Sequence, residues 1–255
     1  MLSKSEKRLI EGLRRPRRRS KEKLILVEGI RTVDEALSTN IEVSFCLRSP
    51  KLLTTDSGKQ LVERLDHNLK EVRDVSDTEL GAISDTANSQ GVLLVCHEPS
   101  QCLSDFGVEA TSTLLIIDGV QDPGNLGTLI RAARAFDISA VIALEGTTDF
   151  WNAKVVRSSV GSIFHSQVFS ESWEYVASWL ERNSTVVLAA DAQGTDITEC
   201  NVKSPWALVV GNENKGIRKN ILDIAKKIAI PMSKDVESLN AGVAGSTLLY
   251  LLTTK

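Results

Sequence analysis

The sequence predicts an α/β protein in which an open, mostly parallel sheet, with helices on both faces, follows a smaller α/β unit. Short apolar runs alternate with helix-like segments along most of the 255 residues. In the second half, these runs are continuously apolar, as expected of parallel strands that are covered on both faces. Residues 98–112 lose this periodicity and gain Pro, Gly, Ser and Thr, which indicates a linker. A chain of this length fits two ordinary domains.

The smaller unit is predicted to span residues 23–97. Ser76 and Glu79 form a capping-box pattern at the start of its last helix. Its expected strands are 23–29, 43–48, 69–73 and 91–96, and its expected helices are 30–39, 58–67 and 76–84.

The larger unit is predicted to span residues 113–255. Ligands of such open sheets collect at the carboxyl ends of the strands, so the loops that follow the strands are the candidate site. The expected strands are 113–117, 139–144, 185–191, 206–211 and 227–230, and the expected helices are 125–136, 152–163, 172–182, 217–226 and 238–252.

Residues 1–22 form a basic arm on an otherwise acidic chain. Ten Lys and Arg residues stand against three Glu in residues 1–23, whereas the whole chain has a net charge of −3. This asymmetry suggests a polyanionic partner that the arm reaches. From charge alone, a solvated tail that aids solubility is an equally good interpretation.

Other features of the sequence narrow the class of protein. The four cysteines form no CxxC pair and the three histidines are scattered, so we expect no metal site. The sequence has no apolar stretch long enough to span a bilayer and no secretory signal, so we expect no membrane partner. Sparse cysteines fit a reducing compartment, and we expect a cytoplasmic protein.

The first candidate loop, "DGVQDPGNLGTLIRAARAFD" (118–137), lacks the G-x-G-x-x-G spacing of a dinucleotide site. Asn125 lies at the expected helix start, where its side chain could cap free N–H groups. Arg131 lies on the polar face and can reach back toward the loop. When this stretch is taken alone, a capped helix with solvated arginines is the favoured interpretation.

Two more loops follow later strands. "GNENKGI" (211–217) is not a P-loop, because Lys215 precedes the glycine, but it offers the carboxylate of Glu213. In "IPMSKDVESLNAGVAGSTLLY" (230–250), Ser238 is expected to begin a helix in which Gly242 and Gly245 permit close packing, at a subunit contact or beside a site. Each loop alone is also compatible with a simple turn.

Taken together and in this order, N-x-G-x-x-x-R, G-N-E-x-x-G and I-P-M…S-L-N resemble the three motifs of the SpoU (TrmH-like) RNA ribose 2′-O-methyltransferases of the SPOUT superfamily. The segment 149–165 resembles that family's intervening helix. "LILVEGIRTVDEAL" (24–37) and "SQGVLLV" (89–95) resemble the ribosomal-protein-like substrate-binding domain that many members carry.

The resemblance implies a C-terminal trefoil knot, a rare feature of folds, together with a homodimer and S-adenosylmethionine as cofactor. It implies that Arg131 is the general base or holds the target phosphate and hydroxyl in line, and that Asn125, Glu213, Ser238 and Asn240 orient the reacting groups. The implied cofactor-binding residues are Val210, Gly211, Ile230, Met232 and Leu239. The RNA-binding candidates are Arg17, Arg18 and Arg19 in the arm and Arg157 in segment 149–165.

We therefore expect S-adenosylmethionine-dependent 2′-O-methylation of a ribose in structured RNA, with ribosomal RNA favoured. One alternative is methylation of tRNA. Another is a non-catalytic RNA-binding or ribosome assembly factor on the same fold, against which the joint presence of the motif residues argues. A nicotinamide dehydrogenase fails on the glycine spacing.

Overall fold

The computed structural model describes residues 2–233, 235–236 and 238–254, which form two compact units. The N-terminal unit comprises Met1–Ser100 and Asp149–His165, and the C-terminal unit comprises Gln101–Thr148 and Ser166–Lys255. Segment 149–165 thus packs with the N-terminal unit, although in sequence it interrupts the larger one. In the part of the chain that the structure describes, no helix is long and apolar enough to cross a membrane.

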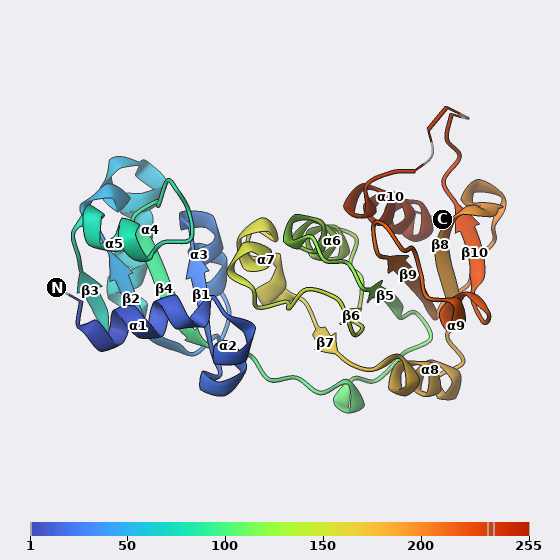
Figure 1. Ribbon diagram of the computed structural model, residues 1–255, viewed down its shortest axis with the longest axis horizontal. Helices are drawn as coiled ribbons and strands as arrows, with labels where there is room; N and C mark the ends of the chain where they lie inside the picture. The colour runs from blue at the N-terminus through green and yellow to red at the C-terminus, as the bar shows by residue number, and fades with distance from the viewer. Residues whose placement is uncertain (1, 234, 237, 255) are drawn as a thin grey trace. The chain divides into compact units, whose positions relative to one another are not determined.

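The N-terminal unit is built on a four-stranded mixed sheet in the order β1-β4-β2-β3 (Figure 1). Strand β4 runs antiparallel to β1 and β2, and β2 runs parallel to β3. The strands are β1 (Leu24–Glu28), β2 (Val43–Arg48), β3 (Val72–Asp74) and β4 (Val92–His97). The helices that join them are α3 (Ile30–Leu37), α4 (Asp56–Asn68), with the 3-10 turn Pro50–Thr54 before it, and α5 (Asp77–Ile83).

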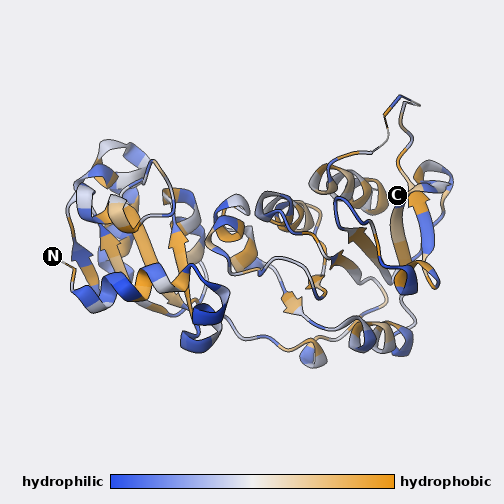
Figure 2. Cartoon of the chain, viewed as in Figure 1, coloured by the Kyte–Doolittle hydropathy of each residue, from blue (hydrophilic) through white to orange (hydrophobic). Residues whose placement is uncertain are grey.

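The basic arm is folded into the N-terminal unit, which corrects its interpretation as a tail. It forms α1 (Lys4–Leu13) and α2 (Pro16–Glu22). Ile10 and Leu13 are buried in the same hydrophobic cluster as Leu80 of α5 and Leu93 of β4. Figure 2 shows the apolar strands of this sheet in orange and the strongly polar α2 in blue. The arm therefore presents its charges from a packed surface.

The described residues of the C-terminal unit form a six-stranded sheet in which every pair of neighbours is parallel, in the order β10-β8-β9-β5-β6-β7. The predicted open parallel sheet is confirmed. The strands are β5 (Thr113–Asp118), β6 (Ala140–Ala143), β7 (Val168–Ser170), β8 (Val186–Asp196), β9 (Trp206–Gly211) and β10 (Lys226–Ala229).

Helices cover both faces of this sheet. On one face, α8 (Trp173–Arg182) and α9 (Lys219–Leu222) share a core with alternate strand residues such as Ile116 and Val209. On the other face, α6 (Pro123–Ala135) packs along α10 (Ala241–Thr253) and on β6, and α10 also contacts β9. The pairing of α6 with α10 joins the first motif to the third.

Several elements differ from the sequence-based expectation. Strand β7 was not predicted, because three residues are too short to show a periodicity. The helix expected at 152–163 ends early as α7 (Ala153–Ser158), before Val160 and Gly161, which both have positive φ angles. Helix α9 covers only part of 217–226. The trefoil knot stays a prediction.

Candidate active site

The loop between β9 and α9 is a tight turn that carries Glu213. The backbone N–H of Asn212 donates to the carbonyl of Gly216 at 3.1 Å, and the N–H of Gly216 donates back to Asn212 at 2.9 Å. Gly211 lies against the far side of this turn, and a Cβ atom there would be 2.5 Å from the carbonyl carbon of Gly216. Because backbone atoms cannot yield, this position requires glycine.

The loop is also held from outside. The carboxylate of Asp118, at the end of β5, is 2% exposed and accepts hydrogen bonds from the backbone N–H and the Nε of Arg218, at 2.8 and 2.7 Å. The side chain of Asn212 donates to the carbonyl of Gly119 at 2.7 Å. These contacts fix the second motif to the first, and the sequence analysis missed all of them.

Helix α6 begins two residues earlier than predicted, and its cap is Asp122 rather than Asn125. The carboxylate of Asp122 accepts from the N–H of Asn125 at 2.8 Å. The side-chain amide of Asn125 is therefore available for other partners, and the predicted capping role for it is wrong.

Asn125 links all three motifs. Its Nδ2 donates to Oε1 of Glu213 at 2.8 Å, and its Oδ1 accepts from Nδ2 of Asn240 at 2.8 Å. Asn240 is in turn the N-cap of α10, since its Oδ1 accepts from the N–H groups of Gly242 and Val243. This chain of side chains, Glu213–Asn125–Asn240, connects the three motif loops by hydrogen bonds.

The close approach of α10 to α6 depends on two glycines. A Cβ on Gly242 would be 3.3 Å from Cβ of Thr128, and a Cβ on Gly245 would be 2.3 Å from Cδ2 of Leu129. The small residues predicted for a subunit contact or a site are thus used within the chain, where they bring Asn240 to Asn125.

A cavity of about 400 Å³ lies beside the Glu213–Asn125–Asn240 chain. All five predicted cofactor-binding residues line it, together with Glu213, Ser238 and Asn240. Its walls come from the carboxyl ends of β8, β9 and β10 and from the start of α10, and they combine apolar side chains with loop backbone. The predicted cofactor residues on this wall are Val210, Gly211, Ile230, Met232 and Leu239.

Asp191 puts a negative charge on the cavity wall, and the sequence analysis missed it. The backbone N–H of Gln193, at 2.8 Å, and the ammonium of Lys227, at 3.2 Å, hold the pKa of the Asp191 carboxyl below its ordinary value. A carboxylate with a lowered pKa stays ionised at neutral pH and favours a cationic group on a ligand.

Arg131 is exposed on α6 and does not line the cavity. Within residues 2–233, 235–236 and 238–254, its side chain forms neither a hydrogen bond nor an ion pair. Its guanidinium is thus free to bind an anion. The structure joins Asn125, Glu213 and Asn240 directly, places Ser238 on the cavity wall, and leaves Arg131 without contact to them.

The four RNA-binding candidates differ in exposure. Arg17 and Arg18 are exposed on α2. Arg19 is only 2% exposed, and it donates to the carbonyl oxygens of Leu13 and Arg14 and to the carboxylate of Asp149. Its assignment to RNA binding is therefore corrected, because its donors are used inside the N-terminal unit. Arg157 lies on α7 and is partly exposed.

Among the residues that the structure describes, no group of three or more His, Cys, Asp or Glu side chains is placed to hold a metal ion.

Comparison with protein families gives two matches, one in each half of the sequence. Residues 112–250 match the SpoU rRNA Methylase family, and residues 6–94 match the MRM3-like substrate binding domain.

Individual proteins resemble the chain over nearly its whole length. The 23S rRNA (guanosine(2553)-2'-O)-methyltransferase RlmP of Bacillus subtilis is 32% identical over 239 residues, which cover 92% of this chain and 90% of the relative. The human mitochondrial rRNA methyltransferase 3 is 24% identical, with 91% of this chain and 68% of the relative covered. The crystal structure of an AdoMet-bound rRNA methyltransferase from Sinorhizobium meliloti superimposes with a TM-score of 0.85 at 26% identity, covering 98% of this chain and 95% of that one.

Proposed function

Because the chain belongs to the SpoU rRNA methylase family, we propose that it transfers a methyl group from S-adenosylmethionine to the 2′-hydroxyl of a ribose in ribosomal RNA. The observation that carries this proposal is the Glu213–Asn125–Asn240 chain beside the cavity. It brings one side chain from each of three loops, separated by up to 115 residues, to the carboxyl edge of a parallel sheet.

The cavity fits the cofactor in size and in chemistry. Its volume of about 400 Å³ lies in the range of about 300–1,000 Å³ that is usual for small-molecule pockets. Ile230, Leu239 and Leu248 offer apolar surface to a base, and the carboxylate of Asp191 offers charge to a cation. When bound, S-adenosylmethionine supplies an activated methyl group on a sulfonium, which needs no metal.

The protein then has to hold the ribose and aim its hydroxyl. A guanidinium is a cation that donates hydrogen bonds and does not accept protons at neutral pH. Arg131 therefore binds the phosphate next to the target ribose and holds the 2′-hydroxyl in line, and it is not the base that removes the proton. Asn125 and Asn240 fix the position of the Glu213 carboxylate at the mouth of the site, and fixed positions are what such a transfer requires of the protein.

The substrate is proposed to be 23S rRNA, with a guanosine as the first candidate nucleotide. The support is the name of the Bacillus subtilis relative, which aligns with this chain over most of both lengths. The domain match at residues 6–94 supports substrate recognition by the N-terminal unit. The exposed Arg17 and Arg18 of that unit add phosphate contacts that increase affinity without selecting sequence.

We also propose a homodimer, a trefoil knot and a cytoplasmic location. The dimer is supported by the apolar surface of α10, on which Val243 and Tyr250 are about half exposed, beside the exposed Leu239. Apolar patches of this kind mark interaction sites. Sedimentation velocity of the wild type and of Val243→Glu tests the dimer, and a monomeric wild type would refute it. Cell fractionation tests the location.

The function is tested with labelled S-adenosylmethionine and 23S rRNA from cells that lack the modification, with tRNA as the second substrate. Label on one ribose 2′-oxygen of the rRNA is expected, and Arg131→Ala should abolish it while Arg134→Ala, an exposed arginine on the same helix, retains it. Label only on tRNA would refute the rRNA assignment. Absence of label on every RNA, with no measurable cofactor binding, would refute the enzyme.

A further inference from the structure

A second cavity of about 400 Å³ lies within the N-terminal unit. It is lined by the end of β1, the first turn of α3, the loop before β4, and Arg157 of α7. Most of the residues that line it are polar, and they carry hydroxyl, amide, guanidinium and carboxylate groups, whereas Ile30 and Val92 add apolar surface. We call it the α3 cavity.

The first turn of α3 presents unused hydrogen-bond donors to this cavity. Its N-cap is Gly29, which has a φ of 95° and no side chain to cap the helix. The N–H of Ile30 donates to Oε1 of Gln90 at 2.8 Å. In the described part of the chain, the N–H groups of Arg31 and Thr32 have no acceptor. A helix N-terminus with free N–H groups attracts anions.

The side chain of Thr32 is an independent sign of a ligand. Thr32 is only 4% exposed and lines the cavity, yet its hydroxyl has no hydrogen-bond partner among the described residues. This hydroxyl is not among the fully buried polar atoms without a partner, so it is accessible from the cavity. An acceptor that enters the cavity finds an unused donor there.

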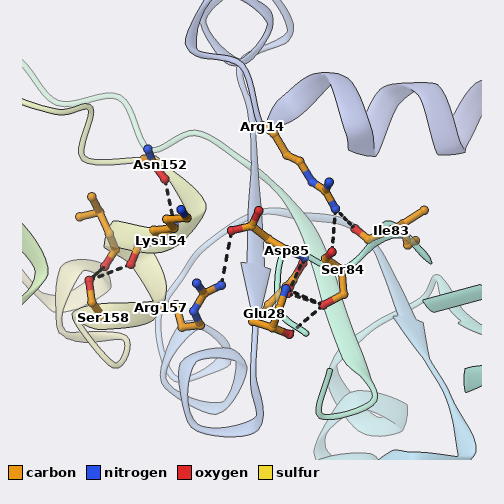
Figure 3. A network of polar contacts seen from close by, with 11 residues as sticks. Arg14, Glu28, Ile83, Ser84, Asp85, Asn152, Lys154, Arg157 and Ser158 are labelled. Carbon is orange, nitrogen blue, oxygen red and sulfur yellow. Dashed lines mark hydrogen bonds and ion pairs between the residues drawn. The ribbon is translucent and has the colours of Figure 1, made fainter. Parts of the chain in front are cut away.

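Arg157 gives the cavity a cation that is incompletely paired (Figure 3). Its Nη1 is buried without a hydrogen-bond partner, and the nearest carboxylate oxygen, Oδ2 of Asp85, is 3.6 Å away. That distance is too long for a hydrogen bond. Arg31, at the start of α3, is exposed and unpaired in the same part of the structure.

One of the two neighbouring carboxylates, that of Glu28, already accepts hydrogen bonds. Glu28 accepts from the hydroxyl of Ser84 at 2.9 Å and from the N–H of Asp85 at 3.0 Å. Arg14 holds the same segment by donating to the carbonyl oxygens of Ile83 and Ser84, as Figure 3 shows. Glu28 is therefore bonded within the N-terminal unit, and Asp85 is the acidic group that faces Arg157.

We propose that the α3 cavity binds a phosphodiester of the substrate RNA. The hydroxyl of Thr32 and the free N–H groups of α3 donate to the phosphate oxygens, and Arg157 and Arg31 neutralise the charge. Donors of Asn88 and Gln90, which also line the cavity, face the attached nucleotide. The assignment rests on the proposed function, since it makes segment 149–165 a part of the surface that recognises RNA.

The test measures the affinity of the full chain for a fluorescent 23S rRNA fragment over a range of KCl concentrations. Thr32→Val removes the hydroxyl with little change of shape, and we expect the dissociation constant to rise about tenfold. Arg157→Gln should weaken binding about tenfold and lower the slope of log K against log salt by about one. Arg182→Gln, an exposed arginine at the end of α8, is the matched control and should change affinity by less than about twofold.

Unchanged affinity for RNA in both Thr32→Val and Arg157→Gln would overturn the proposal. Equal melting temperatures and equal binding of S-adenosylmethionine show that the variants are folded. Competition by inorganic phosphate at constant ionic strength, in the wild type but not in Thr32→Val, would support the proposal, because the RNA and the free ion would then share the cavity. Inorganic phosphate that binds the wild type without displacing the RNA fragment would assign the cavity to a free ion and overturn the proposal. If the wild type methylates no RNA, the proposed function fails, whereas the RNA affinities still decide the role of the cavity.

Discussion

Gly211→Ala tests whether the turn that carries Glu213 shapes the cofactor cavity. The new Cβ would lie 2.5 to 2.7 Å from the carbonyl carbon and oxygen of Gly216 and the N of Ile217. Because these are backbone atoms, the turn must open. Opening it breaks the two hydrogen bonds between Asn212 and Gly216.

The magnitude follows from these two bonds. Each contributes about 0.5–1.5 kcal/mol, so a closed turn becomes less favourable by about 1–3 kcal/mol. Since about 1.4 kcal/mol corresponds to a tenfold change in affinity, the dissociation constant for S-adenosylmethionine should rise about 5- to 140-fold.

The assay is titration calorimetry of the purified protein with S-adenosylmethionine, together with thermal unfolding. Gly81→Ala is the matched control, because nothing lies within 4 Å of a Cβ built on Gly81, in helix α5. That change should leave cofactor affinity unaltered and stabilise the helix by about 0.5–1 kcal/mol. A Gly211→Ala variant that binds the cofactor within about twofold of the wild type would refute the reasoning.

Three further predictions concern the site and the core. Arg19→Ala should lower the free energy of unfolding by about 3 kcal/mol in urea titration, because it removes a buried guanidinium that bonds to Asp149 and to two backbone carbonyls. The exposed Arg17→Ala should cause no such loss, and equal losses in the two variants would contradict this difference between buried and exposed arginine. Asn125→Ala should reduce kcat/KM by about tenfold or more with little change in melting temperature, since its two side-chain bonds join loops at an exposed edge. Unchanged kinetics would show that the hydrogen bonds among Glu213, Asn125 and Asn240 have no part in the mechanism. Burial raises the pKa of the Cys46 thiol from 9.0 to about 12, so the unfolded state loses this proton first and stability should fall as pH rises through that window. Cys46→Ala should make the fall shallower, and an identical pH profile would show that the thiol does not contribute.

The sequence predicted the large sheet because its signal is local. Each central strand, such as β5 or β9, is a continuous apolar run, because a strand that is buried on both faces carries apolar residues at nearly every position. Strand β7 escaped because it has three residues. Helix starts were less certain, since Asp122 and Asn125 are both good caps and only the backbone geometry selects Asp122.

The candidate site was predicted in its parts but not in its connections. The motifs identified Asn125, Glu213 and Asn240. The spacing of the motifs along the sequence does not indicate that Asn125 bonds to both Glu213 and Asn240. Asp118 and Asp191 were missed because a carboxylate at a strand end has no distinctive sequence signal. Their roles depend on Arg218 and Lys227, which come from other strands and loops.

By itself, the sequence determined the class of fold, the order of the strands along the chain and the residue types at the strand ends. These properties depend on periodicity and composition within short windows. The tertiary structure alone decided that Arg19 is buried against Asp149 and that Arg157 belongs to the N-terminal unit. It also decided that α10 lies close enough to α6 for Asn240 to reach Asn125. Such contacts join residues more than 100 positions apart, and their energy appears only when the sheet and its helices have brought them together.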